Sequence, residues 1–430
     1  MINEKTFFIK TYGCTSNKSD SEIMIALLEK NGYRRTKLNE ARYLILNTCG
    51  VKQQTEEKII SALKKFSSLN SRIIIAGCLP RINIERIKKV IPSFSAIIDT
   101  RSIHRIVEVI KKIEEGKNNL IFFSDEPPIK PSMPKSLTNP IIGIIQISEG
   151  CNLGCSYCCT RFGRGRLYCY PKDEIIKEAK RLLSMGCKEI YLTSQDTGAY
   201  KYEDFTLVEL INEISKIEGK FFVRVGMMNP VHAKRILDEL VSSYQNKKIF
   251  KFLHLPLESG SDNILLKMKR GYKANDFISI VERFREKIPE ITISTDVIVG
   301  FPGETEDDFS STIKILEKIM PDIVNISKFG PRPGTEASRM KQLERKTINK
   351  RSSLLSEIVR KICLEKNEKW IGWEGNIIVD EKGKNQSWIG RNFAYKQVVI
   401  NCNKNIFGKF VDVKIIGAAP THLIGEIVKI

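Results

Sequence analysis

Three cysteines near the middle of the chain constrain its fold more than any other feature. Cys151, Cys155 and Cys158 form a Cys-x3-Cys-x2-Cys run, and no fourth cysteine follows at a matching spacing. Clusters that only carry electrons are usually held by four cysteine thiolates. Three thiolates leave one iron open to a small molecule. The run therefore predicts a [4Fe–4S] cluster with one open iron.

Zinc is the alternative ligand for closely spaced cysteines. Structural zinc sites take four ligands, usually as two Cys or Cys/His pairs, and no histidine lies near this run. The spacing and the flanking residues 146–158 instead resemble the radical S-adenosylmethionine (SAM) superfamily. That resemblance implies that the open iron binds SAM.

The first segment alternates short apolar runs with amphipathic patterns, which is typical of a doubly wound parallel sheet of an α/β fold. We expect strands at 7–12, 43–46, 72–76 and 97–98, and helices at 21–30 and 54–66. Cys14, Cys49 and Cys78 each directly follow one of the first three strands, with a glycine alongside. Ligands gather at the carboxyl ends of parallel strands. The three thiols should therefore converge and hold a second cluster, although buried structural cysteines are the alternative.

A second strand–helix segment follows a linker. Five prolines among Lys, Ser and Asn mark the region from about 116 to 140 as irregular. Beyond it we expect six strands at 142–147, 189–193, 221–225, 250–255, 291–299 and 323–326. Six such units predict a partial (β/α)6 barrel with its chemistry at the carboxyl ends of the strands.

Polar residues follow several of these strands where the radical SAM superfamily holds its cofactor. The resemblance predicts SAM contacts from Gln195, Asp196, His254, Glu258, Ser259, Gly300 and Glu304. Each has a structural alternative. Thr305 and Asp308, for example, form a capping-box pattern that only starts a helix. No side-chain acid or base is predicted to be catalytic, because the radical is generated at the cluster.

The last segment changes character from about residue 370. Apolar and polar residues alternate at 375–380, 394–400 and 410–415, with glycine turns between them. This pattern predicts a small antiparallel β-barrel that displays stacking and basic groups to RNA. The candidate RNA contacts are Arg391, Phe393, Tyr395 and Lys396, and the alternative is that some of them are core side chains.

Charge and cysteine content narrow the partner and the compartment. The 430 residues carry a formal net charge of +20, which favours nucleic acid over a membrane surface as the partner. No apolar run approaches the roughly 18 residues of a membrane span, and the start of the chain lacks the pattern of a secretory signal. Eleven cysteines then indicate metal ligands and buried thiols in a reducing cytoplasm.

Together the segments resemble the methylthiotransferases, a radical SAM family with two clusters. The motifs that carry the resemblance stand at 149–152, 164–165, 254–261, 300–305 and 331–335. Over the whole chain it implies an N-terminal domain with the auxiliary cluster (1–115), a linker (116–138), a radical SAM core (139–366) and a TRAM RNA-binding barrel (367–430).

The chain is most similar to the archaeal and eukaryotic branch that acts on N6-threonylcarbamoyladenosine at tRNA position 37. The discriminating stretches are 11–17, 47–52, 193–200 and 224–230. The resemblance implies that a flavodoxin or ferredoxin supplies one electron, that SAM is cleaved at the central cluster, and that the 5′-deoxyadenosyl radical attacks C2 of the base. Sulfur is then delivered at the N-terminal cluster, and a second SAM gives the methyl group.

Within this branch, Asp196, Thr197 and Asn229 are expected to hydrogen-bond the polar threonylcarbamoyl group. Two departures from the family pattern stand at Glu258, commonly Gln, and Cys169, commonly Ser. The alternative substrates are isopentenyladenosine in tRNA and an aspartyl residue of a ribosomal protein. A non-catalytic iron–sulfur RNA-binding protein is the alternative from another class.

Overall fold

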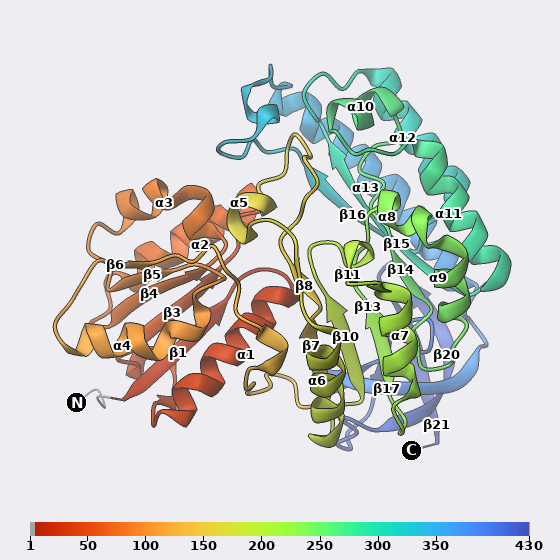
Figure 1. The fold of residues 1–430 in the computed structure, drawn as a ribbon. Helices are drawn as coiled ribbons and strands as arrows, with labels where there is room; N and C mark the ends of the chain where they lie inside the picture. The colour runs from red at the N-terminus through yellow and green to blue at the C-terminus, as the bar shows by residue number, and fades with distance from the viewer. Residues whose placement is uncertain (1–4, 430) are drawn as a thin grey trace.

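The N-terminal part of the chain forms a fully parallel sheet. The computed structural model describes residues 5–429, and Figure 1 shows this sheet beside a larger α/β body. Its strands are β1 (Thr6–Thr11), β2 (Arg34–Arg35), β3 (Tyr43–Thr48), β4 (Arg72–Gly77), β5 (Ala96–Ile98) and β6 (Leu120–Phe122). Their order is β2-β1-β3-β4-β5-β6. This confirms the predicted doubly wound sheet.

Both faces of this sheet are covered by helices. Ile45 on β3 packs with α1 (Thr15–Lys30) and α4 (Ile106–Glu114), whereas its neighbour Leu46 packs with α2 (Gln53–Phe66) and α3 (Leu79–Val90). Burial on both faces explains why these strands are continuous apolar runs. Helix α1 begins at Thr15 rather than at the predicted Ser21. Its first turns are polar, and the amphipathic pattern missed them because their polar side chains are buried.

The central body is a six-stranded half-barrel. Its strands are β7 (Ile142–Gln146), β10 (Glu189–Thr193), β13 (Phe222–Val225), β14 (Phe252–His254), β15 (Thr292–Val299) and β16 (Ile323–Lys328). They form two three-stranded parallel sheets, and a parallel bridge from Val223 to Ile249 continues the arc between β13 and β14. The predicted partial barrel is confirmed.

Helices cover the outside of the half-barrel and share one hydrophobic core with its strands. They are α6 (Lys172–Ser184), α7 (Leu207–Lys216), α8 (Pro230–Arg235), α9 (Leu237–Tyr244), α11 (Ala274–Lys287), α12 (Glu306–Ile319) and α13 (Arg345–Glu368). Shorter elements occupy the connections: β8 (Ser148–Glu149), α5 (Thr160–Arg164), β9 (Tyr168–Cys169), β11 (Lys201–Tyr202), β12 (Phe205–Thr206) and α10 (Asp262–Lys267).

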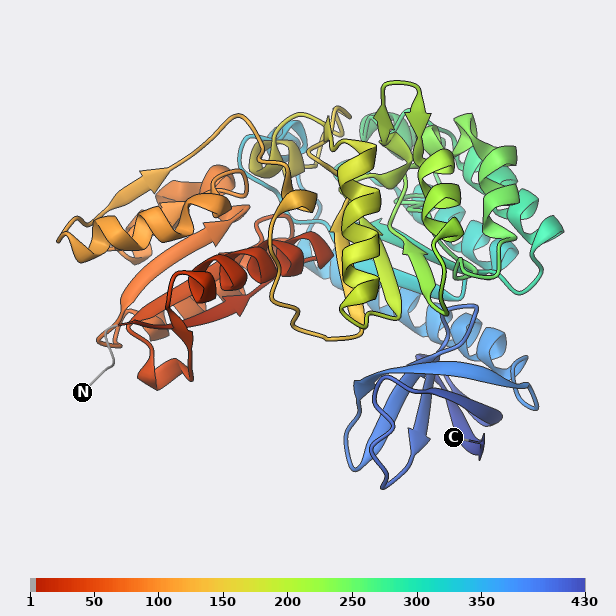
Figure 2. The ribbon, with the colours of Figure 1, turned by 60° about the horizontal axis from the view of Figure 1, so that its bottom comes forward.

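The C-terminal segment closes into a small barrel that lies beneath the half-barrel in Figure 2. It consists of β17 (Glu374–Lys382), β18 (Ser387–Arg391), β19 (Gln397–Asn401), β20 (Phe410–Ala419) and β21 (His422–Lys429). Neighbouring strands are antiparallel except β19 and β21, which pair in parallel and complete the closure. No helix within residues 5–429 is both long enough and apolar enough to cross a membrane.

A buried ion pair fastens this small barrel to the half-barrel. Lys396 Nζ lies 2.7 Å from Asp322 Oδ1, just before β16, and 2.8 Å from Asn367 Oδ1 at the end of α13. The Lys396 and Asp322 side chains are 6% and 3% exposed. Removing one partner of a buried pair leaves the other charge without compensation. The pair should therefore contribute to the stability of the interface between the two bodies.

We expect Lys396→Met to lower the free energy of unfolding by about 3 kcal/mol, the lower end of the effect of breaking a buried ion pair, because Lys366 lies 3.9 Å from the same carboxylate. All three tryptophans lie in residues 370–388, so denaturant unfolding followed by tryptophan fluorescence reports on this region. Lys414→Met is the control, since Lys414 pairs with Glu374 on the half-exposed surface and should have no measurable effect. Equal effects from both variants would contradict the docking role.

Candidate active site

The structure brings Cys14, Cys49 and Cys78 together at the carboxyl edge of the N-terminal sheet, after the adjacent strands β1, β3 and β4. Asn17, in the first turn of α1, lies beside them. Its Oδ1 is 3.4 Å from Cys14 Sγ and 4.0 Å from Cys78 Sγ. Its Nδ2 donates to the Thr48 carbonyl at 3.1 Å, which ties α1 to the end of β3. Sequence reasoning did not single out Asn17 as a site residue, although it lies in a quoted motif.

The surroundings of this triad fit a cluster. Gly13 and Gly77 have φ values of +127° and +99°, which favour glycine, and a Cβ at Gly13 would stand 2.8 Å from the Cβ of Cys49. Burial raises the pKa of the thiols of Cys49 and Cys78, and the other cysteines of the triad add to the effect. Three thiolates here need a cationic centre between them, which iron supplies.

The second triad, Cys151, Cys155 and Cys158, lies on the loop between β8 and α5. A donor faces each sulfur. The backbone N–H two residues after Cys151 and the one two residues after Cys158 each lie 3.4 Å from the sulfur, and Arg270 Nη1 lies 3.4 Å from Cys155 Sγ. Burial raises the pKa of Cys151 to about 11. Hydrogen bonds to the sulfurs suit thiolate ligands of an iron–sulfur cluster.

Among residues 5–429, no three His, Cys, Asp or Glu side chains are placed to hold one ion together. The cysteines of a [4Fe–4S] cluster each bind a different iron, so they need not converge on one point. The donor type, three cysteine thiols in each triad, fits an iron–sulfur cluster.

A buried charge network connects the two triads. Arg164, at the end of α5, lies 2.9 Å from Glu149 Oε1 and from Asp20 Oδ2, and it donates to Asn17 Oδ1 at 3.1 Å. Lys130 lies 2.8 Å from the other oxygens of Asp20 and Glu149. These four charged side chains are at most 2% exposed. Because Asn17 contacts the first triad and Glu149 precedes the second by two residues, the network fixes one triad relative to the other.

Residues near the Cys151–Cys158 loop position that loop. Gln195 Oε1 accepts a 2.6 Å hydrogen bond from the N–H of Gly150. Glu258, with φ +61°, accepts from Tyr157 at 2.8 Å and lies 3.9 Å from Arg270. Burial raises the pKa of Glu258. The carboxyl group that departs from the family's glutamine thus lies behind the cysteine loop. The sequence alone did not indicate a role for Arg270, because it lies far along the chain from the cysteines and outside the motifs named above.

The other predicted SAM contacts lie at the same end of the half-barrel. His254 Nε2 pairs with Asp296 Oδ2 at 2.7 Å. The carboxylate of Glu304 accepts from the N–H of Gly300 at 2.9 Å and from Arg351 at 2.8 Å. These two bonds tie Glu304 to the start of the loop after β15 and to α13. Ser259 is buried, and its hydroxyl accepts from a backbone N–H at 3.2 Å. The predicted capping box at the start of α12 is present.

The three residues expected to hold the threonylcarbamoyl group are already paired within the fold. Asp196 accepts from the N–H of Asn229 at 3.0 Å and lies 2.7 Å from His232 Nδ1. Thr197 donates to two backbone carbonyls at 3.0 Å, and Asn229 caps α8. The carboxylate of Asp196, the hydroxyl of Thr197 and the Oδ1 atom of Asn229 thus already have partners within the chain, and their role toward the threonylcarbamoyl group stays a prediction. Their partners come from another strand end, which sequence spacing alone did not reveal.

The four candidate RNA contacts lie at the junction with the half-barrel rather than on an open face of the small barrel. Lys396 is buried in the ion pair with Asp322. Arg391 pairs with Asp380 at 3.3 Å. Phe393 packs between tryptophans at centroid distances of 5.9 and 6.1 Å. As placed, the Lys396 ammonium group is unavailable to a phosphate, which corrects its predicted role as an RNA contact.

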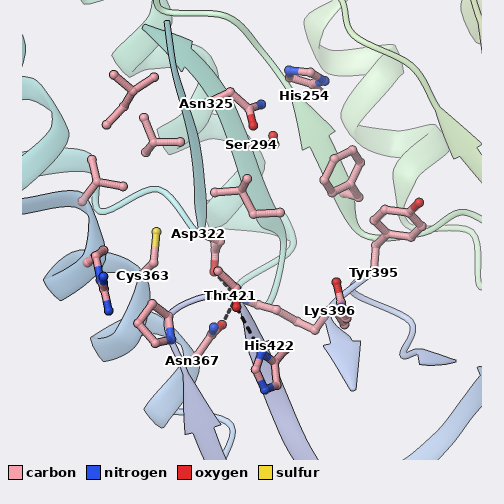
Figure 3. Close-up of a pocket in the computed structure, with 18 of the residues that line it drawn as sticks. His254, Ser294, Asp322, Asn325, Cys363, Asn367, Tyr395, Lys396, Thr421 and His422 are labelled. Carbon is pink, nitrogen blue, oxygen red and sulfur yellow. Dashed lines mark hydrogen bonds and ion pairs between the residues drawn. The ribbon is translucent and has the colours of Figure 1, made fainter. Parts of the chain in front are cut away.

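A cavity of about 630 Å³ lies between the half-barrel and the small barrel. Figure 3 shows His254, Ser294 and Asn325 on the half-barrel strands, and Lys396 and His422 from the small barrel on another side. The cavity therefore extends from His254, at the carboxyl end of β14, down to the barrel junction.

Three family models match consecutive parts of the chain. They are described as "Uncharacterized protein family UPF0004" over residues 6–99, the Radical SAM superfamily over 145–316 and the TRAM domain over 370–428. A radical SAM methyltransferase, TsrM from Kitasatospora setae, solved with tryptophan and a SAM analogue bound, superposes with a TM-score of 0.58. It covers 78% of this chain and 75% of its own, at 14% identity, so the likeness is one of fold. These matches define a radical SAM enzyme with an N-terminal cysteine domain and a TRAM barrel.

Relatives along nearly the whole chain specify the family. A protein of Methanothermobacter thermautotrophicus, named a probable threonylcarbamoyladenosine tRNA methylthiotransferase, is 39% identical over 97% of this chain and 99% of its own. Proteins of Drosophila melanogaster and Homo sapiens, named threonylcarbamoyladenosine tRNA methylthiotransferase, are each 34% identical over 98% and 97% of this chain, and over 77% and 73% of their own. The chain belongs to the threonylcarbamoyladenosine tRNA methylthiotransferases, and its cofactors are SAM and [4Fe–4S] clusters.

Replacing one cysteine triad should affect the reaction differently from replacing the other. Reconstituted protein should hold about eight irons, four in each cluster, and replacing either triad with alanines should remove about half of them. The variant without Cys151, Cys155 and Cys158 should form no 5′-deoxyadenosine from SAM, whereas the variant without the N-terminal triad should form it but transfer no sulfur. Cys159, Cys169, Cys187, Cys363 and Cys402 are the controls, and single alanine replacements there should keep both clusters. Equal loss of SAM cleavage from both triple variants would contradict this division.

Proposed function

We propose that the chain adds a methylthio group to C2 of N6-threonylcarbamoyladenosine at position 37 of tRNA. The observation that carries the proposal is the pair of cysteine triads linked through the buried network around Arg164, in a chain similar over nearly its whole length to enzymes named for this base. The substrate carbon bears an aromatic hydrogen that acid–base chemistry does not remove. The bound clusters and SAM supply the radical and sulfur chemistry that this carbon requires.

The chain's own residues hold this chemistry in place. Gln195 fixes the start of the cysteine loop through Gly150, and Arg270 donates to Cys155. The buried network around Arg164 fixes the N-terminal triad, which would hold the auxiliary cluster, relative to the cysteine loop 151–158, which would hold the SAM-binding cluster. In the proposal residues 1–115 carry the auxiliary cluster, 116–138 form the linker, 139–366 bind SAM, and 367–430 contact the tRNA.

The remaining partners follow from the same reaction. Reductive cleavage of SAM needs one electron, and we propose a flavodoxin or a ferredoxin as its source. The tRNA substrate and the reducing conditions that free thiols require favour action in the cytoplasm. The isopentenyl, ribosomal-protein and non-catalytic alternatives receive no support from the relatives described above.

The substrate assignment predicts a clear order among three tRNAs. The same tRNA should be prepared with threonylcarbamoyladenosine, isopentenyladenosine or plain adenosine at position 37, and methylthio nucleosides should be measured by mass spectrometry after reaction with the reconstituted protein. We expect product from the threonylcarbamoyl form and at most traces from the other two. Equal or faster reaction of the isopentenyl form would overturn the substrate while leaving the enzyme class intact.

A further inference from the structure

Arg224, on β13, is a cavity-lining arginine without a polar partner. Within residues 5–429 its guanidinium has no hydrogen bond or ion pair, and its Nε is buried. Arg391 and Lys396, which line the same cavity, are paired with Asp380 and Asp322. Buried polar groups are almost always hydrogen-bonded, and an exception calls for an explanation such as a missing ligand.

Aromatic rings hold the Arg224 guanidinium in the cavity wall. Its central carbon lies 4.8 Å from the ring centre of Phe252, 5.1 Å from that of Tyr395 and 5.3 Å from that of Tyr191. Such contacts stabilise the cation. They accept none of its conventional hydrogen bonds, so the planar fork of N–H donors remains able to bind a carboxylate or phosphate with two bonds.

The neighbouring carboxyl groups do not occupy these donors. Glu189, two residues before Tyr191 on β10, bonds the Tyr191 hydroxyl at 2.9 Å. Burial and the repulsion of Asp380 raise the pKa of the Glu189 carboxyl group, whereas Arg391 and Arg224 act to lower it. Asp322 is paired with Lys396, and Asp296 is paired with His254. The free cation therefore faces a cavity of about 630 Å³, within the size range of ligand pockets.

We propose that Arg224 binds the carboxylate of the threonyl group on the substrate base and selects that base over one carrying an apolar group. The inference rests on the proposed function. A threonylcarbamoyl group ends in a free carboxylate, which matches the two-pronged guanidinium. An isopentenyl group offers no acceptor and would leave Arg224 unpaired.

The test compares an anticodon stem-loop carrying threonylcarbamoyladenosine with the same RNA in which that carboxylate is a neutral methyl ester. The fully loaded wild-type enzyme, Arg224→Lys and Arg224→Met are assayed for kcat/KM and, by fluorescence anisotropy, for binding. A charge-assisted pair implies that esterification lowers wild-type kcat/KM roughly 10- to 100-fold. Arg224→Met should react equally slowly with both RNAs, and Arg224→Lys should keep part of the preference for the acid.

Arg360→Gln is the matched control, because Arg360 lines the same cavity from the exposed side of α13. Arg360→Gln should lower kcat/KM and binding by the same factor for both RNAs. If the wild-type enzyme does not act on threonylcarbamoyladenosine at all, the proposed function fails. If it acts on the acid and the ester equally well, or if Arg224→Met reduces both in parallel, the enzyme assignment stands and the role of Arg224 is overturned. The wild-type comparison decides this even if Arg224→Met does not fold.

Discussion

Arg164 is the contact through which the two halves of the active site depend on each other. Its side chain bonds Asp20 and Asn17 on α1 of the N-terminal part and Glu149 on β8 of the central body. Burial disfavours the charge on Asp20, yet Lys130 and Arg164 outweigh this and lower the pKa of its carboxyl group. A buried network of this kind is costly unless every member is paired, and it then favours one arrangement. That property suits a reaction in which hydrogen removal and sulfur delivery address the same carbon.

At the opposite end of the half-barrel, the small barrel packs closely against the strands. Tyr395 reaches from the small barrel onto Phe252 and shares a 2.8 Å hydrogen bond with the Tyr191 hydroxyl, while Lys396 is buried against Asp322. The segment that sequence patterns assign to RNA contact thus forms one wall of the cavity beside Arg224.

Much of the fold could be predicted because its signals are local. Six apolar runs locate the strands of the half-barrel, and cysteines at successive strand ends indicate which side chains meet. Features that depend on distant partners could not be predicted. The first turns of α1 lack an apolar face because Asp20 and Asn17 bond Arg164, far along the chain. The alternation of apolar and polar residues at 394–400 predicts a barrel strand there, which the structure places at β19, but it does not reveal which face another domain covers.

The most direct test of this account is Arg164→Lys, which keeps the charge but cannot bridge three acceptors as a guanidinium does. The measurement is the amount of methylthio nucleoside formed per 5′-deoxyadenosine, in protein whose iron content equals that of the wild type. The account predicts that SAM cleavage continues while this ratio falls roughly tenfold or more, as expected for the loss of charge-assisted hydrogen bonds that hold reacting groups in place. An unchanged ratio with both clusters loaded would contradict it.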